Sequence, residues 1–238
     1  MIRYPYVLLD ADNTLYDFDA AEHKALCKVL LNRGYTPDSE TLKIYLEINN
    51  SLWAAFARGK VEQEFLLVER FRRFEEAMGG NNDPVQFNAD YVNALGSNAD
   101  LIPGALEFCR HLSDMGCVLA IVTNGAAVAQ RGRYAISGLG EYIPNLFISQ
   151  ELGVNKPDPL FFDYVCRNLE IEDRGQALVV GDSLSSDILG GNQAGIDTVW
   201  FNPHGTALKG PAKPTYTAAM YTEIEAIIAG EPAEEKKR

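Results

Sequence analysis

The fold of this chain is decided by one short stretch near its start, Tyr6-Val7-Leu8-Leu9-Asp10-Ala11-Asp12-Asn13-Thr14. The apolar run predicts a buried strand, and it ends at two carboxylates one residue apart. Burying like charges together disfavours the ionised form of both, so such a pair is costly unless a cation or a reaction requires it. The plain alternative is a turn at the end of the strand, because Asp and Asn are common turn residues.

Short apolar runs like the first recur along the chain. Counted with the first, they cover residues 4–9, 118–123, 177–181 and 198–201, and each is typical of a buried strand. Between them, residues 104–115 and 158–169 carry apolar side chains at helical spacing. Gly116 should end the first of these helices, and Asp158 with Pro159 should begin the second. This alternation predicts an α/β fold, with a doubly wound, mostly parallel sheet covered on both faces.

Residues 17–96 follow a different pattern, with helical periodicity, many charges and almost no strand signal. Asp19 and Glu22 have the spacing of a capping box, and further helices are expected at about 38–58 and 61–78. We therefore expect a catalytic core of residues 1–16 and 97–231 and a helical cap of residues 17–96. The polar residues 232–238 are expected to form a flexible tail.

Composition excludes several classes of protein. The 238 residues carry a formal net charge of −12, which argues against a nucleic-acid-binding surface and against adhesion to anionic membranes. The four scattered cysteines predict small core residues instead of disulfides or a zinc site. No basic segment followed by a long apolar run opens the chain, and no run is long enough to span a bilayer. We expect a cytoplasmic protein.

Polar residues follow each predicted strand or stand in a nearby loop, where active groups gather in open parallel sheets. Besides the first pair they are Thr123-Asn124-Gly125, Lys156, Asp182 and Asp187. Oxygen ligands of this kind suit Mg²⁺, whereas zinc would favour His or Cys. A lysine can neutralise clustered aspartates and bind a phosphoryl oxygen, and Thr123 with the N–H groups that follow it can bind another. The set favours phosphoryl transfer to a carboxylate.

Each of these residues has an ordinary structural explanation when it is taken alone. Thr123 could cap a helix, Lys156 could be solvated, Asp182 could belong to a turn and Asp187 could cap a short helix. Their occurrence together in this order is what indicates a site.

The order Asp10-x-Asp12-x-Thr14-Leu15, Thr123-Asn124-Gly125, Lys156-Pro157 and Gly181-Asp182-x₄-Asp187 resembles the four motifs of the haloacid dehalogenase superfamily. The resemblance implies a Rossmann-like core with an α-helical cap of the first type. It also implies roles. Asp10 would attack phosphorus to form an aspartyl-phosphate, and Asp12 would act as general acid and base. Mg²⁺ would bind Asp10, the carbonyl of Asp12 and Asp182, with Asp187 orienting its waters. Thr123, Asn124 and Lys156 would bind the phosphoryl group.

Within that superfamily, true dehalogenases lack an acid/base Asp at the position of Asp12, so the resemblance favours phosphate-ester chemistry. Further segments, among them Leu15-Tyr16-Asp17-Phe18, Ser186-Asp187-Ile188-Leu189 and Trp200-Phe201-Asn202, resemble the bacterial pyrimidine 5′-nucleotidase branch. The implied substrate is a small phosphate ester, a nucleoside monophosphate. Asn49 is a candidate contact to a base edge, while Trp53 and Phe56 fit cap packing at least as well as base stacking.

Other functions remain compatible with the sequence. On the same scaffold they are a sugar-phosphate phosphatase, a phosphotransferase or phosphomutase, and a 2-haloacid dehalogenase. A non-enzymatic phospho-acceptor of the receiver type would also cluster Asp, Thr and Lys on such a sheet. Asp12 and the helical insertion argue against the last two. The sequence leaves the base or sugar preference and the oligomeric state open.

Overall fold

The computed structural model describes residues 2–230, and these residues form two compact units. The first unit contains the described parts of residues 1–17, 100–125 and 137–238, and the second contains Phe18–Ala99 and Ala126–Ile136. The assignment of residues 1–16 and 97–231 to a catalytic core and of residues 17–96 to a cap stays a prediction. The predicted flexible tail, residues 232–238, lies outside the described residues.

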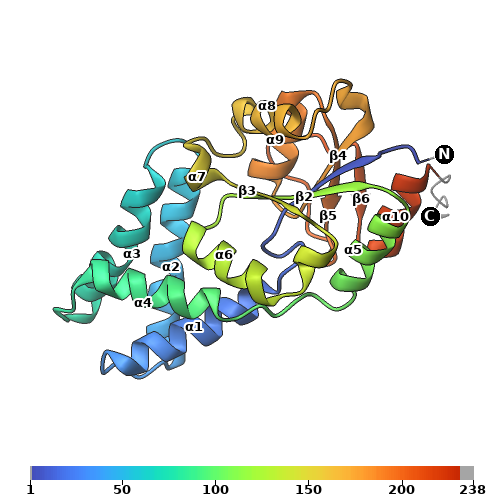
Figure 1. Cartoon of the computed structure of the whole chain (residues 1–238). Helices are drawn as coiled ribbons and strands as arrows, with labels where there is room; N and C mark the ends of the chain where they lie inside the picture. Colours follow the sequence, from blue (N-terminus) through green and yellow to red (C-terminus); the bar gives the residue numbers. More distant parts are fainter. Residues whose placement is uncertain (1, 231–238) are drawn as a thin grey trace. The chain divides into compact units, whose positions relative to one another are not determined.

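A six-stranded parallel sheet forms the centre of the first unit (Figure 1). Its strands are β1 (Tyr6–Leu9), β2 (Val118–Thr123), β3 (Asn145–Ile148), β4 (Ala177–Gly181), β5 (Asp197–Phe201) and β6 (Tyr216–Ala218). Their order is β3-β2-β1-β4-β5-β6, so the chain runs outward from β1 in one direction and then in the other. This confirms the doubly wound sheet predicted from the sequence. The carboxyl ends of β2, β1 and β4 lie side by side, at the point where such sheets bind ligands.

Helices cover both faces of this sheet. They are α5 (Ala105–Asp114), α7 (Ser149–Leu152), α8 (Pro159–Asn168), α9 (Leu189–Ala194) and α10 (Tyr221–Ala229). Figure 1 shows α8 and α9 on one side of the sheet and α5 and α10 on the other. The predicted boundaries are confirmed at α5 and α8. Gly116 has a φ of 89° just after α5, and the Asp158 side chain accepts a hydrogen bond from Leu160 N–H at the start of α8.

The sheet is buried because its strands carry apolar side chains on both faces. Val7, Leu8 and Leu9 of β1 are fully buried. One buried cluster joins Leu8 and Val179 to Phe161 and Phe162 of α8, which explains the apolar stripe on that helix. Cys109, Cys117 and Cys166 are buried, as predicted for small core residues, whereas Cys27 is only partly buried.

The second unit is helical. Its helices are α1 (Phe18–Asn32), α2 (Ser39–Phe56), α3 (Gln63–Met78), α4 (Pro84–Gly96) and α6 (Ala127–Ile136). An aromatic cluster of Tyr45, Phe71, Phe74, Phe87 and Tyr91 lies at its centre. The predicted capping box at Asp19 is wrong, because α1 already begins at Phe18. Glu22 instead accepts hydrogen bonds from Asn49 and Tyr91 inside the unit.

The membrane prediction can be checked on the helices. Within residues 2–230 the structure has no helix that combines the length and the apolar character needed to cross a bilayer.

Candidate active site

The loop that follows β1 carries Asp10 and Asp12. Asp10 continues the strand, since its N–H donates to the Val180 carbonyl at 2.8 Å. The chain then closes a tight turn, in which the Ala11 carbonyl accepts hydrogen bonds from the N–H groups of Leu15 and Tyr16 at 2.9 Å each. This turn places Asn13 at a φ of 57°, a left-handed conformation that Asn tolerates better than most residues. Main-chain hydrogen bonds therefore hold the turn that carries the two aspartates.

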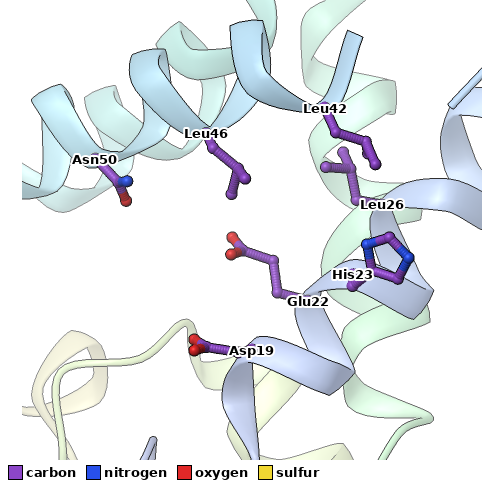
Figure 2. A pocket seen from close by; sticks show the side chains of 7 residues that line it. All are labelled: Asp19, Glu22, His23, Leu26, Leu42, Leu46 and Asn50. Atoms are coloured by element: carbon purple, nitrogen blue, oxygen red, sulfur yellow. The ribbon is translucent and has the colours of Figure 1, made fainter. Parts of the chain in front are cut away.

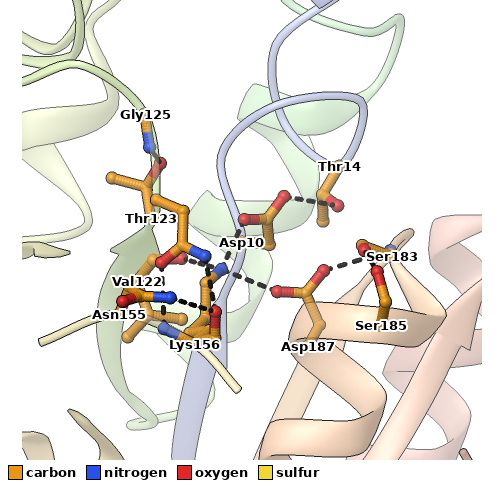
Figure 3. A network of polar contacts seen from close by, with 11 residues as sticks. Asp10, Thr14, Val122, Thr123, Gly125, Asn155, Lys156, Ser183, Ser185 and Asp187 are labelled. Carbon is orange, nitrogen blue, oxygen red and sulfur yellow. Dashed lines mark hydrogen bonds and ion pairs between the residues drawn. The ribbon is translucent and has the colours of Figure 1, made fainter. Parts of the chain in front are cut away.

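Both carboxylate oxygens of Asp10 have a partner (Figure 3). Oδ1 accepts from the Lys156 ammonium at 2.7 Å, and Oδ2 accepts from the Thr14 hydroxyl at 3.2 Å. The Asp10 side chain is only 10% exposed, so these contacts lie largely out of water. They fix the orientation of the carboxylate. The sequence analysis had given Thr14 no role, although its position four residues after Asp10 was visible in the motif.

Lys156 uses its ammonium group on three acceptors. Nζ donates to Asp10 Oδ1 at 2.7 Å, to Asp187 Oδ1 at 2.6 Å and to the Val122 carbonyl at 2.7 Å. Burial alone would lower the pKa of Lys156, but the carboxylates of Asp10 and Asp187 outweigh that effect and raise the pKa above its usual value. The lysine is therefore a buried cation, and the solvated side chain considered above is excluded.

Asp187 is the penultimate residue of the segment Leu184–Ile188, which forms a π-helical turn after β4. Its second oxygen, Oδ2, accepts a hydrogen bond from Ser183 N–H at 3.1 Å. The carboxylate packs directly on Gly181, where a Cβ atom would come within 2.4 Å of Asp187 Cγ. Glycine is therefore required at the end of β4, because any larger residue would displace the carboxylate.

Asp10, Asp182 and Asp187 form a cluster in which one oxygen from each lies within 4.8 Å of the others. Burial, together with the neighbouring carboxylate of Asp187, raises the pKa of Asp10 to about 7. Burial and the carboxylate of Asp10 likewise raise the pKa of Asp182 to about 8. The single ammonium of Lys156 therefore does not offset the negative charge of the three carboxylates. A cluster of this size, made of oxygen ligands only, fits a hard divalent cation.

Thr123 is the last residue of β2, and Asn124 follows it; β2 pairs with β1 on the side opposite β4. The Thr123 hydroxyl accepts from Gly125 N–H at 3.0 Å and can still donate its own hydrogen. The Asn124 amide is paired with the main chain of Lys156, accepting from its N–H at 3.0 Å and donating to its carbonyl at 2.8 Å. The Asn124 side chain therefore holds the loop that carries Lys156. Phosphate binding by these two residues stays a prediction.

The structure brings three predicted carboxylates, which follow β1 and β4, into one cluster. Lys156, which was also predicted, joins this cluster through its ammonium and contacts Asn124 through its main chain. Asp12 is partly exposed in the same turn as Asp10, and its side chain is not one of the three clustered carboxylates. A metal contact through the Asp12 carbonyl oxygen stays a prediction. The roles of these residues are not decided by their positions alone.

A cavity of about 360 Å³ lies within the helical unit, between α1 and α2 (Figure 2). The carboxylates of Asp19 and Glu22 point into it, opposite Leu46 and Asn50. Among the described residues, no lysine or arginine lines this cavity, whereas the cluster at the sheet contains the buried Lys156. The described lining therefore offers a phosphate two carboxylates and no compensating ammonium or guanidinium group. Asn49 does not line this cavity. Its amide donates to Glu22 at 3.1 Å and accepts from Arg70 at 3.3 Å, so its side chain is committed to the interior of the unit.

The chain thus combines a parallel doubly wound sheet with clustered aspartates and a buried lysine near the carboxyl ends of its central strands. Residues 4–195 match the model of the haloacid dehalogenase-like hydrolases, and the chain belongs to this family. It is 35% identical to the pyrimidine 5′-nucleotidase PynA of Streptococcus pneumoniae, over 93% of each chain. It is 31% identical to the pyrimidine 5′-nucleotidase YjjG of Escherichia coli, over 95% of this chain and 99% of that one.

The fold is shared with a solved relative. The crystal structure of the HAD-hydrolase YfnB of Bacillus subtilis bound to magnesium superposes with a TM-score of 0.89, at 32% identity over 95% of this chain and 99% of that one. The family resemblance stated from the motifs is therefore confirmed.

Proposed function

We propose that this protein is a Mg²⁺-dependent phosphomonoesterase that hydrolyses pyrimidine nucleoside 5′-monophosphates through a phosphorylated Asp10. The observation that carries the proposal is the Asp10 carboxylate, which is fixed on both oxygens beside two further carboxylates. The nucleotide preference is supported by the names and near full-length coverage of the two nucleotidase relatives.

The donor set fits magnesium. Asp10 and Asp182 would bind the ion with their carboxylates, and Asp12 would do so with its carbonyl oxygen. The raised pKa values of Asp10 and Asp182 support this assignment, because burial and the neighbouring carboxylates disfavour the charged forms that a bound cation would stabilise. When bound, a divalent cation would neutralise the carboxylates and the charge of the phosphoryl group. Asp187, whose oxygens accept hydrogen bonds from Lys156 and from Ser183 N–H, would lie outside the direct ligands and orient the waters of the ion.

The residues of the chain divide the reaction between them. An oxygen of Asp10 attacks phosphorus in line, the bond to the ester oxygen breaks, and Asp12 donates its proton to that leaving oxygen. Asp12 then takes a proton from water, whose oxygen attacks the phosphorus of the aspartyl-phosphate. This step releases inorganic phosphate and returns Asp10 to its carboxylate form. Thr123 and the amide groups of its loop would bind phosphoryl oxygens, and Lys156 would offset the charge of the intermediate.

The test is a panel of phosphate esters assayed for release of inorganic phosphate in the presence of Mg²⁺. We expect the highest kcat/KM for pyrimidine nucleoside monophosphates, with purine nucleotides and sugar phosphates well below. Asp10→Asn should reduce release to background, and excess chelator should do the same to the wild type. Asp114→Asn is the matched control, because Asp114 is an exposed residue at the end of α5.

Three results would contradict parts of the proposal. Near-normal turnover by Asp10→Asn would exclude it as the nucleophile. Unchanged turnover in chelator would exclude the metal. A clear preference for sugar phosphates would overturn the nucleotide assignment and leave the hydrolase family unaffected.

A further inference from the structure

Tyr221, the first residue of α10, reaches the loop that carries Asp10. Its hydroxyl donates to the Thr14 carbonyl at 2.7 Å. The hydroxyl of the same threonine donates to Asp10 Oδ2 at 3.2 Å, and Thr14 is fully buried. One residue near the end of the chain therefore fixes the main chain of Thr14, and Thr14 in turn fixes one oxygen of Asp10.

The ring of Tyr221 is held in place by two other aromatic rings. It lies between Phe108 of α5 and Phe201 of β5, with ring centroids 4.7 and 5.1 Å away and interplanar angles of 20° and 14°. Such stacked rings restrict the tyrosine to one orientation. Burial, as the largest cause, raises the pKa of its hydroxyl above the ordinary value, so the group remains a donor at neutral pH.

A second aromatic residue supports the other acidic loop. The indole N–H of Trp200 donates to the Asp182 carbonyl at 2.8 Å. Trp200 is opposite Gly181 in the register of β4 and β5, so its side chain lies next to the point where the Asp182 loop begins. It is 5% exposed and packs in a small cluster with Ile188 and Ala212.

The two supports meet at the end of β5. Trp200 and Phe201 are consecutive, and consecutive side chains of a strand point to opposite faces of the sheet. One face therefore supplies the donor to Asp182, and the other supplies the ring that stacks on Tyr221. The last two residues of a single strand thus contribute to the positions of both acidic loops.

We infer that Tyr221 and Trp200 are positioning residues, which hold the loops of Asp10 and Asp182 so that the two carboxylates converge on one cation. This inference rests on the proposed function for the identity of the site. Neither residue touches the reacting atoms in this account; both act through a main-chain carbonyl. The hydrogen bonds from Tyr221 to Thr14 and from Trp200 to Asp182 carry this role. Removing either bond while an aromatic ring is kept should therefore weaken Mg²⁺ binding.

The first variant is Tyr221→Phe, which keeps the ring between Phe108 and Phe201 and removes only the hydroxyl. We expect the Mg²⁺ dissociation constant of the substrate-free protein, measured by titration calorimetry, to rise by about threefold to tenfold. With a phosphate ester at saturating Mg²⁺, kcat should fall on the order of tenfold while KM stays unchanged, because the carboxylate is misplaced and binding contacts are kept.

Tyr216→Phe is the matched control. Tyr216 also is a tyrosine of the first unit, and its hydroxyl contacts that of Tyr4 at 3.1 Å instead of an acidic loop. It should leave both the Mg²⁺ affinity and kcat at wild-type values.

The second variant is Trp200→Phe. It should weaken Mg²⁺ binding by a similar factor, and excess Mg²⁺ should restore most of its turnover, since the defect lies in a metal ligand. A purely structural role would instead lower the melting temperature and the active fraction, with the Mg²⁺ affinity of the folded protein unchanged.

Wild-type Mg²⁺ affinity in Tyr221→Phe and Trp200→Phe would overturn the inference. Failure of the proposed function has a different signature. If the wild type binds Mg²⁺ but releases phosphate from no ester, the proposed function is wrong, and the affinities of the two variants still decide the positioning inference. If the wild type binds no Mg²⁺ at all, both are overturned.

Discussion

Lys156 is the residue on which the electrostatics of the site depend most. Its ammonium is 1% exposed and has two carboxylates and one carbonyl as partners. Removing one partner from a buried group of charges is costly, because the remaining charges are left in a poorly solvating environment. The main effect of losing this lysine should therefore fall on Asp10 and Asp187.

We predict that Lys156→Met lowers the free energy of unfolding by about 3–5 kcal/mol at neutral pH and abolishes turnover. Urea unfolding followed by circular dichroism measures the first effect. The deficit should shrink as the pH is lowered, because the carboxylates then take up protons. Lys43→Met is the control, since Lys43 is 74% exposed and its ion pair with Glu47 is worth about 0.5 kcal/mol or less. Equal stability of Lys156→Met and the wild type would refute the prediction.

Much of the site could be predicted at the residue scale, because its acidic and basic residues directly follow apolar runs or lie in a nearby loop. Asp10, Asp182 and Lys156 were found in this way. The role of the Asn124 side chain was not, because its partner is the main chain of Lys156, thirty-two residues away. Tyr221 is 207 residues from Thr14, and no local pattern links the two.

At the scale of elements, the central strands were predictable and the edges of the sheet were not. β1, β2 and β4 consist almost entirely of apolar residues, and β5 ends in the apolar run Val199-Trp200-Phe201, as expected of strands buried on both faces. β3 has only four residues, three of them partly exposed, and β6 has three residues. An edge strand needs less apolar surface, so its sequence signal is weak.

The helix α6 was not specified from the sequence, and it has a glycine in its middle. Gly132 is required by the crossing of α4 and α6, where a Cβ atom would come within 2.7 Å of the Gly96 carbonyl oxygen. The close approach of two helices therefore outweighs helix propensity at this position.

We predict that Gly132→Ala destabilises the helical unit by about 1–3 kcal/mol, although alanine is the better helix former. The melting temperature measures the effect. Ala135→Gly in the exposed part of the same helix gives the cost of propensity alone, which is about 1 kcal/mol. A Gly132→Ala variant more stable than the wild type would show that the close approach of α4 and α6 does not require glycine at this position.

For the molecule as a whole, the acidic cluster couples stability to pH. Burial raises the pKa of Asp10 to about 7 and that of Asp182 to about 8, compared with 3.8 for an ordinary aspartate. Between these limits the folded protein holds protons that the unfolded chain has released. Its stability must therefore fall as the pH rises through this window.

We predict that the urea midpoint of the metal-free protein decreases from about pH 5 to about pH 8, and that Mg²⁺ raises it more at the higher pH. Asp182→Asn should flatten the decrease, because it removes the group with the most strongly raised pKa. Other groups titrate in this range, so the comparison between wild type and variant is the measurement. An unchanged slope in Asp182→Asn would show that the cluster does not cause the decrease.

The contacts of Lys156 also bear on the order in which the protein is assembled. The internal ammonium of Lys156 partly compensates the carboxylates in the absence of a metal, so folding does not require a bound ion to offset all of their charge. A fold that had to wait for its ion would need tight binding. We therefore expect this protein to fold without its ion, and to gain further stability when a divalent cation binds.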